Sequence, residues 1–202
     1  MAHPNGTTLL NTVAVRTDFG PAIRVAAVVF MTVLTAAAAQ VSIPLPFTPV
    51  PLTLQPMIVL LGGAALGPRL GMTSQLIYLA AGLSGLPVFA ASPALPPGLL
   101  RLLGPTGGFL MAYPLAAFVT GSLGERGFDR RYLTSAIAMT AGLAVIFACG
   151  IAWLAWFAAP APTGLANALS LGLYPFILAD IVKLLAAAAV LPSIWKLTGA
   201  RL

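Results

Sequence analysis

Two ionisable residues of opposite charge lie three positions apart near the C-terminal end of the chain, inside an apolar segment. They are Asp180 and Lys183, within Ala179-Asp180-Ile181-Val182-Lys183. A spacing of three places both side chains on one face of a helix, close enough to pair. Ionisable groups inside an apolar span are costly and usually face an interior cavity or pathway. The pair is therefore a candidate solute-binding site; the alternative is a structural ion pair that locks this helix against a neighbour.

Two loops between the apolar segments could complete such a site. Residues 44–51 contain four prolines, so this segment is stiff and extended and could form a preset lid over a cavity or only a rigid connector. The loop 83–107 exceeds the usual length of an idle connection and carries Arg101. An arginine can hold a carboxylate through two parallel hydrogen bonds. Arg101 is therefore a second candidate, and the alternative is an ordinary exposed loop arginine.

The other reactive residues argue against catalysis. Neither lysine, Lys183 or Lys196, follows a Gly-x-x-x-x-Gly run, so the sequence has no phosphate-binding loop for ATP. The single histidine, His3, offers no zinc motif and no base for a nucleophile. Cys149, the single cysteine, lies in an apolar segment and is expected to pack there. We expect recognition and passage of a solute, with no enzyme activity, no metal site and no covalently bound cofactor.

The composition indicates which elements position these residues. Of the 202 residues, 59% are hydrophobic and only 7% are charged, whereas about a quarter of the residues of a soluble domain carry charge. This excludes a cytosolic enzyme, a disordered tail and a disulfide-stapled secreted module. The formal net charge is +6, but the basic residues are scattered rather than gathered into a groove-binding patch, so no nucleic acid partner is expected.

The hydropathy pattern predicts an all-α integral membrane protein, a single polytopic domain over residues 1–202 with a polar N-terminal tail at 1–20. A membrane-spanning helix needs about 20 largely apolar residues. The second and third predicted spans are shorter, so a tilted or re-entrant pair is an alternative there. The six predicted transmembrane helices cover residues 24–41, 51–66, 68–82, 108–123, 132–158 and 174–197.

The basic residues predict an orientation. With six spans both termini share one side of the membrane, and eight of the ten basic residues fall there. Cytoplasmic segments carry the excess of Lys and Arg, so both termini are predicted to be cytoplasmic. Asp180 then lies about 9 Å below the outer end of the last span, which predicts a solute cavity near the outer face. The eight residues are Arg16, Arg24, Arg69, Arg126, Arg130, Arg131, Lys196 and Arg201.

Five polar residues in the predicted helices and loops have two interpretations each. They could line a cavity or could hydrogen-bond a neighbouring helix. Near the first span, Ala22 and Ala26 form a small-xxx-small pair, which lets another helix approach closely. The five polar residues are Gln55, Gln75, Tyr78, Tyr113 and Asn167.

Four segments of the chain form recognisable motifs. They are the proline-rich segment 44–54, Gly85-Leu86-Pro87-Val88-Phe89-Ala90, Gly104-Pro105-Thr106-Gly107-Gly108-Phe109-Leu110 and Tyr174-Pro175-Phe176-Ile177-Leu178-Ala179-Asp180-Ile181-Val182-Lys183. These motifs together resemble the BioY family, the biotin-binding S components of energy-coupling-factor transporters. The similarity extends over nearly the whole chain, from the first to the sixth predicted helix. The most specific parts are the Gly-Pro-Thr-Gly-Gly run and the Asp-x-x-Lys pair.

The resemblance implies a six-helix subunit of the bacterial cytoplasmic membrane that captures biotin near its outer face. Its implied partners are the lipid bilayer, a transmembrane coupling subunit and paired ABC-type ATPases, which alone use ATP. Asp180 and Lys183 are implied at the biotin site, with Arg101 at a basic position of the outer loop. Ala22 and Ala26 match the family's contact with the coupling subunit. The other expected ligand-binding residues are Gly104, Thr106, Gly107, Tyr174 and Phe47.

The chemistry of biotin fits these residues. An ionised Asp180 can accept a hydrogen bond from a ureido N–H, and Arg101 or Lys183 can pair with the carboxylate tail; the sequence does not decide between the two cations. An unpaired charge in a dry cavity costs several kcal/mol, so Asp180 and Lys183 are expected to pair when the site is empty. Biotin uptake is the leading hypothesis. The alternatives are an ion-coupled secondary transporter of a small carboxylated solute, with Asp180 carrying a proton, and a ligand-free membrane scaffold subunit.

Overall fold

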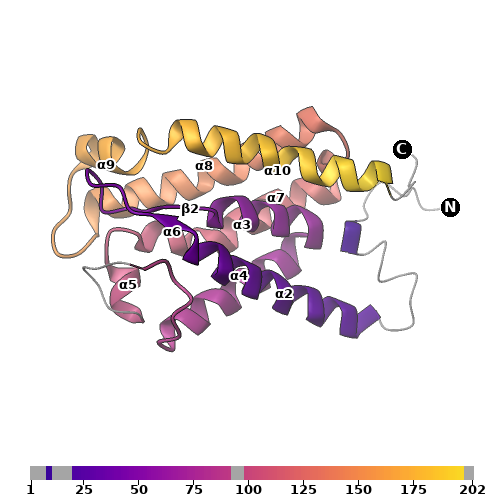
Figure 1. Cartoon of the computed structure of the whole chain (residues 1–202), viewed down its shortest axis with the longest axis horizontal. Coiled ribbons are helices and arrows are strands. Elements are labelled where there is room, and N and C mark those ends of the chain that lie inside the picture. Colours follow the sequence, from indigo (N-terminus) through magenta and orange to yellow (C-terminus); the bar gives the residue numbers. More distant parts are fainter. Residues whose placement is uncertain (1–7, 11–19, 92–97, 198–202) are drawn as a thin grey trace.

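The chain folds into an elongated bundle of helices that run roughly along one direction (Figure 1). The computed structural model describes residues 8–10, 20–91 and 98–197. Predictions on His3, Arg16, Arg201 and most of the N-terminal tail lie outside these residues. The elements are α2 (Gly20–Gln40), β1 (Ser42–Ile43), β2 (Leu52–Thr53), α3 (Gln55–Leu66), α4 (Pro68–Leu83), α5 (Leu99–Leu103), α6 (Gly107–Met111), α7 (Tyr113–Glu125), the 3-10 turn η1 (Phe128–Arg130), α8 (Tyr132–Trp156), α9 (Leu165–Gly172) and α10 (Ile177–Leu197).

A helix overlaps each of the six predicted spans. Within the described residues, four helical segments are long and apolar enough to cross a membrane. These four are α2, the α6–α7 segment Gly107–Glu125, α8 and α10. Helices α3 and α4 have 12 and 16 residues, or about 18 and 24 Å at 1.5 Å per residue, against a hydrocarbon core of about 30 Å. The described chain is therefore a helical multi-pass membrane protein with four candidate spans, and the count of six stays a prediction.

Glycines allow the short helices α3 and α4 to pack tightly against α7. A Cβ on Gly63 would lie 2.3 Å from Thr120 Oγ1, and a Cβ on Gly71 would lie 2.8 Å from the Cα of Gly63. Gly67 joins the two helices with a φ of +86°, a conformation that favours glycine. Pro68 follows in the first turn of α4, where its fixed φ suits a helix start. The centre of the bundle is therefore closely packed.

Irregular structure gathers at one end of the bundle, which we call the hairpin end. It carries α5, α9 and the antiparallel hairpin of β1 and β2, paired through Ser42 with Thr53 and Ile43 with Leu52 (Figure 1). The sequence does not predict these strands, because two residues are too few to show the alternation of apolar and polar side chains that marks a strand. α2 begins and α10 ends at the opposite end, which we call the terminal end.

A buried clamp closes the terminal end. Trp195 of α10 donates its indole N–H to Asp129 Oδ2 of η1 at 2.7 Å, and Asp129 is buried. The guanidinium of Arg130 lies 5.1 Å from the centre of the Trp195 ring. The turn between α7 and α8 is thus attached to the last helix by a hydrogen bond and a cation–π contact.

This clamp predicts a pH dependence of stability. Burial raises the pKa of the Asp129 carboxyl above its ordinary value of 3.8, and the Trp195 hydrogen bond and the Arg130 charge oppose the rise only in part. The folded state therefore keeps this proton to higher pH than the unfolded state, so the contribution of Asp129 to the free energy of unfolding falls as pH rises from 3.8 through the folded-state pKa. Asp129→Asn keeps an acceptor oxygen for Trp195 but cannot titrate. Its melting temperature minus that of the wild type should therefore increase from about pH 4 to about pH 7; a flat difference would contradict the raised pKa.

Candidate functional site

Two adjoining cavities lie at the hairpin end of the bundle. The first contains Arg101, and the second contains Asp180 and Lys183. Five residues line both cavities, so these form a common wall. They are Val50, Pro51, Thr53, Phe109 and Tyr113.

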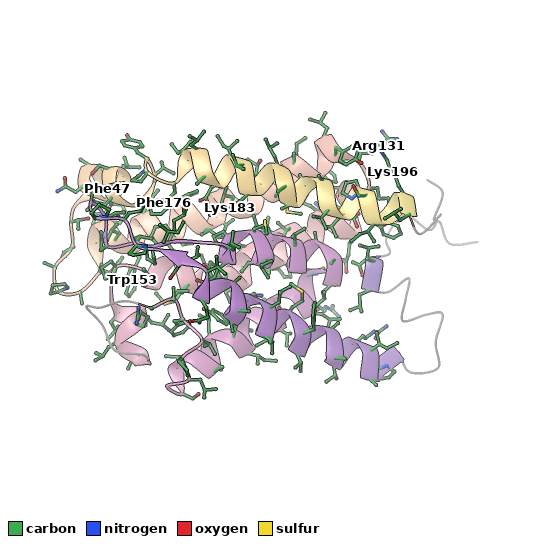
Figure 2. All side chains as sticks on the ribbon, viewed as in Figure 1. Phe47, Arg131, Trp153, Phe176, Lys183 and Lys196 are labelled. Atoms are coloured by element: carbon green, nitrogen blue, oxygen red, sulfur yellow. The ribbon has the colours of Figure 1, made fainter. Side chains whose placement is uncertain are left out.

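The charged pair of α10 is formed and connects this helix to the hairpin. Lys183 Nζ makes an ion pair with Asp180 Oδ1, and it also donates to the backbone carbonyl of Thr53 at 2.8 Å. The two side chains are only 14% and 7% exposed. Figure 2 shows Lys183 near Phe176, toward the hairpin side of α10. The carboxylate and the carbonyl together compensate the buried ammonium charge. Removing either partner is destabilising unless another polar group takes its place.

Arg101 reaches the first cavity from α5. It is 7% exposed, and its Nη1 donates to the carbonyl of Ala90 at 2.8 Å. Burial lowers the pKa of this guanidinium from its ordinary value, but arginine stays protonated in proteins. The residues that line this cavity include no aspartate or glutamate, so their side chains together carry one positive charge, which suits an anionic ligand group.

A buried chain of hydrogen bonds holds the loop after α4 behind Arg101. Gln55 Nε2 donates to the hydroxyl of Tyr78 at 2.6 Å, and this hydroxyl donates to the carbonyl of Val88 at 3.2 Å. The Tyr78 ring also packs edge-on against Phe89, with ring centres 5.4 Å apart. Gln55 and Phe89 line the first cavity. Of the five polar residues with two interpretations, Gln55 and Tyr113 therefore line a cavity, whereas Tyr78 supports one from behind.

The Gly-Pro-Thr-Gly-Gly run shapes the first cavity. Thr106 lines it together with Pro105. Gly104 accepts a hydrogen bond from Trp153 Nε1 at 2.9 Å. A Cβ on Gly107 would lie 1.7 Å from the carbonyl oxygen of Leu102. Gly104 and Gly107 thus position the wall, and Thr106 presents a side chain to the cavity.

The proline segment forms a wall, but two expected residues point elsewhere. Pro49 lines the first cavity, and Thr48 fastens the segment by donating its hydroxyl to the carbonyl of Leu171 in α9 at 2.7 Å. Phe47 and Tyr174 are each 61% exposed, and neither lines the two cavities. The structure brings together Asp180, Lys183, Arg101 and Thr106, but not Phe47 and Tyr174.

Sequence reasoning missed the apolar and backbone parts of the site. Phe109, Ile146 and Phe147 line the second cavity, yet their types match the rest of an apolar chain. The carbonyl of Thr53 is a partner of Lys183 that no side-chain pattern could indicate.

The expected partner-contact residues lie far from these cavities. Ala22 and Ala26 are in the first turns of α2, and both are exposed. Arg24 and Val25 between them are exposed as well. The surface is accessible to another helix, and its partner stays a prediction.

Comparisons with known proteins identify a family. Residues 10–200 match the BioY family. The chain is 46% identical over 167 residues to the probable biotin transporter BioY of Pyrococcus horikoshii, covering 83% of this chain and 91% of that protein. It is 38% identical over 167 residues to the biotin transporter BioY of Thermotoga maritima, covering 82% and 92%. It is also similar to a crystal structure of the S-component for biotin from an ECF-type ABC transporter, with a TM-score of 0.77 and 26% identity over 89% of this chain and 94% of that chain.

The ion pair makes a stability prediction that needs no ligand. Lys183→Met should lower the free energy of unfolding by about 3–5 kcal/mol, because it leaves the Asp180 carboxylate buried without its counter-ion. The double variant Asp180→Asn/Lys183→Met should recover most of this loss, and Arg69→Met, which removes an exposed cation from α4, serves as the control. Chemical denaturation in detergent micelles measures the effect. A double variant no more stable than Lys183→Met would show that the pairing is not what stabilises this site.

Proposed function

This chain belongs to the BioY family, and from that membership we propose that it captures biotin as the S component of an energy-coupling-factor transporter. The observation that carries the proposal is the pair of adjoining cavities, one with Asp180 and Lys183 and the other with Arg101. Biotin has a polar ureido ring at one end and a carboxylate at the other, so it needs two polar sites joined by an apolar passage. The named relatives are biotin transporters.

The electrostatics of the two cavities favour one direction for the ligand. Asp180 and Lys183 neutralise each other, so the second cavity suits the uncharged ureido ring, with the Asp180 carboxylate accepting from a ureido N–H. The charge of Arg101 suits the carboxylate, which a guanidinium can hold with two parallel hydrogen bonds. Phe109 and Tyr113 of the common wall would contact the apolar parts between them.

Ligand binding then has to rearrange contacts of the hairpin. Lys183 holds the Thr53 carbonyl in the empty site, and a ureido group that bonds to Asp180 competes for the same pair. The common wall includes Val50 and Pro51 of the proline segment. A ligand that occupies both cavities must contact or displace Val50 and Pro51. The proline segment therefore acts as a cover of the site, and its position depends on the contacts among Asp180, Lys183 and Thr53.

Transport requires partners that supply energy, because this sequence has no phosphate-binding loop. We assign that role to a transmembrane coupling subunit and paired ABC-type ATPases in the bacterial cytoplasmic membrane. Ala22 and Ala26 are the proposed contact with the coupling subunit. We assign both termini to the cytoplasm because eight of the ten basic residues fall on their side; with this assignment the hairpin end and its cavities lie at the outer face.

The first test is binding of biotin by the purified protein in detergent. Biotin should raise the apparent melting temperature, because a ligand that binds only the folded state stabilises it. Asp180→Asn and Lys183→Ala should each weaken binding at least about 30-fold, since each leaves a buried partner without its charge. Lys196→Ala, at the terminal end, is the control. If biotin does not raise the melting temperature of the wild-type protein, the proposed function is wrong. If the variants bind biotin with normal affinity, only the assignment of Asp180 and Lys183 to the site is wrong.

A second test separates the two cations. Arg101→Gln should weaken binding of biotin at least about 30-fold but change binding of biotinamide little, because biotinamide lacks the carboxylate that Arg101 holds. Isothermal titration with both ligands measures the difference. Equal losses for the two ligands would instead place the carboxylate at Lys183 and leave Arg101 as a support of the outer loop through Ala90.

A further inference from the structure

A cluster of basic and hydroxyl side chains lies at the terminal end, at the junction of α8 and α10. Lys196 donates to the hydroxyl of Tyr132 at 3.2 Å, and its ammonium lies 4.5 Å from the centre of that ring. Ser193 lies 3.4 Å from the same hydroxyl. Arg131 precedes Tyr132 in the chain, and Figure 2 shows Arg131 and Lys196 at the same corner of the molecule. We call these four residues the α8–α10 corner.

Within residues 8–10, 20–91 and 98–197, no carboxylate lies at ion-pair distance from either cation of this corner. Arg131 and Lys196 are both exposed. Asp129, two residues before Arg131, is buried and accepts a hydrogen bond from Trp195. The corner therefore presents two exposed positive charges at this end of the bundle.

Exposed apolar side chains continue from this corner along both helices. On α8, Leu133 is 75% exposed and Ile137 follows one turn later; on α10, Leu185 and Val182 are exposed and lie about three and four turns before Lys196, on the same face of the helix. Both helices are candidate membrane spans, so these side chains face hydrocarbon. A surface with cations at its end and an apolar stripe beside it matches an amphiphile with an anionic head.

We propose that the α8–α10 corner binds an anionic phospholipid, with the headgroup phosphate on Arg131 and Lys196 and the acyl chains along Leu133, Ile137, Leu185 and Val182. Basic pockets between transmembrane helices are suited to such headgroups, and tyrosine is suited to the interface between headgroups and hydrocarbon. An acidic surface of a protein partner could satisfy the cations, but it would not explain the apolar stripe. The site is separate from the biotin site at the hairpin end.

Native mass spectrometry tests the site on protein purified in detergent with equal amounts of phosphatidylglycerol and phosphatidylcholine. The wild type should retain phosphatidylglycerol in preference to phosphatidylcholine. Each cation near a membrane surface contributes about a fivefold attraction, so Arg131→Gln/Lys196→Gln should lower this preference about 25-fold at low ionic strength. Arg131 makes no side-chain hydrogen bond as the N-cap of α8, so its replacement removes charge without removing a cap.

The matched control is Arg24→Gln/Arg69→Gln, which removes two exposed cations from α2 and α4 and should leave the preference unchanged. If the double variant of the corner does not fold, Lys196→Gln alone should lower the preference about fivefold. Equal retention of both lipids by the wild type, or equal losses in corner and control variants, overturns the proposal. Unchanged lipid preference with loss of assembly with partner subunits would assign the corner to a protein partner instead.

Discussion

A charge inside an apolar bundle persists only where another group compensates it, and this requirement organises the binding end of the molecule. Lys183 satisfies it with two partners, the carboxylate of Asp180 one turn earlier and the carbonyl of Thr53, 130 residues away in the chain. The first partner is local and follows from the helical spacing. The second partner joins α10 to the hairpin and thereby fixes the position of the proline segment. The common wall of the two cavities thus depends on the hydrogen-bond partners of one ammonium group.

Two further polar side chains act in the same way on other loops of the hairpin end. Tyr78 links α3 and α4 to the loop after α4 through Gln55 and the Val88 carbonyl, and Trp153 links α8 to Gly104. Directional hydrogen bonds therefore attach these loops to the helices. By contrast, glycines such as Gly63 bring α3, α4 and α7 into close contact in the centre, which leaves space for a ligand chiefly where the helices give way to loops.

The sequence could predict those parts of the structure that local pattern determines. Hydropathy predicted the helices that lie in the six apolar segments to within a few residues, but not the short helices α5 and α9. The spacing of Asp180 and Lys183 indicated their pairing. It could not predict the hairpin, whose strands have two residues each, or the role of the Thr53 carbonyl, because both depend on contacts between distant segments. Phe47 and Tyr174 lie in motifs of the family, but a motif does not tell which way a side chain points. Both are exposed in the structure.

The two ends of the bundle are stabilised by different kinds of contact, and this difference fits a protein that must capture and release a solute. At the terminal end, Asp129 and Trp195 form a buried contact with no ligand-binding residue in it, so nothing in the binding reaction competes for it. At the hairpin end, the partners of Lys183 are a carboxylate and a carbonyl, the same kinds of group that the proposed ligand carries. Leaving either charge of the pair without a partner would cost several kcal/mol, so under the proposed function the ligand has to replace the contacts that it removes. The clamp between η1 and α10 shares no residue with these contacts, so such an exchange leaves the clamp intact.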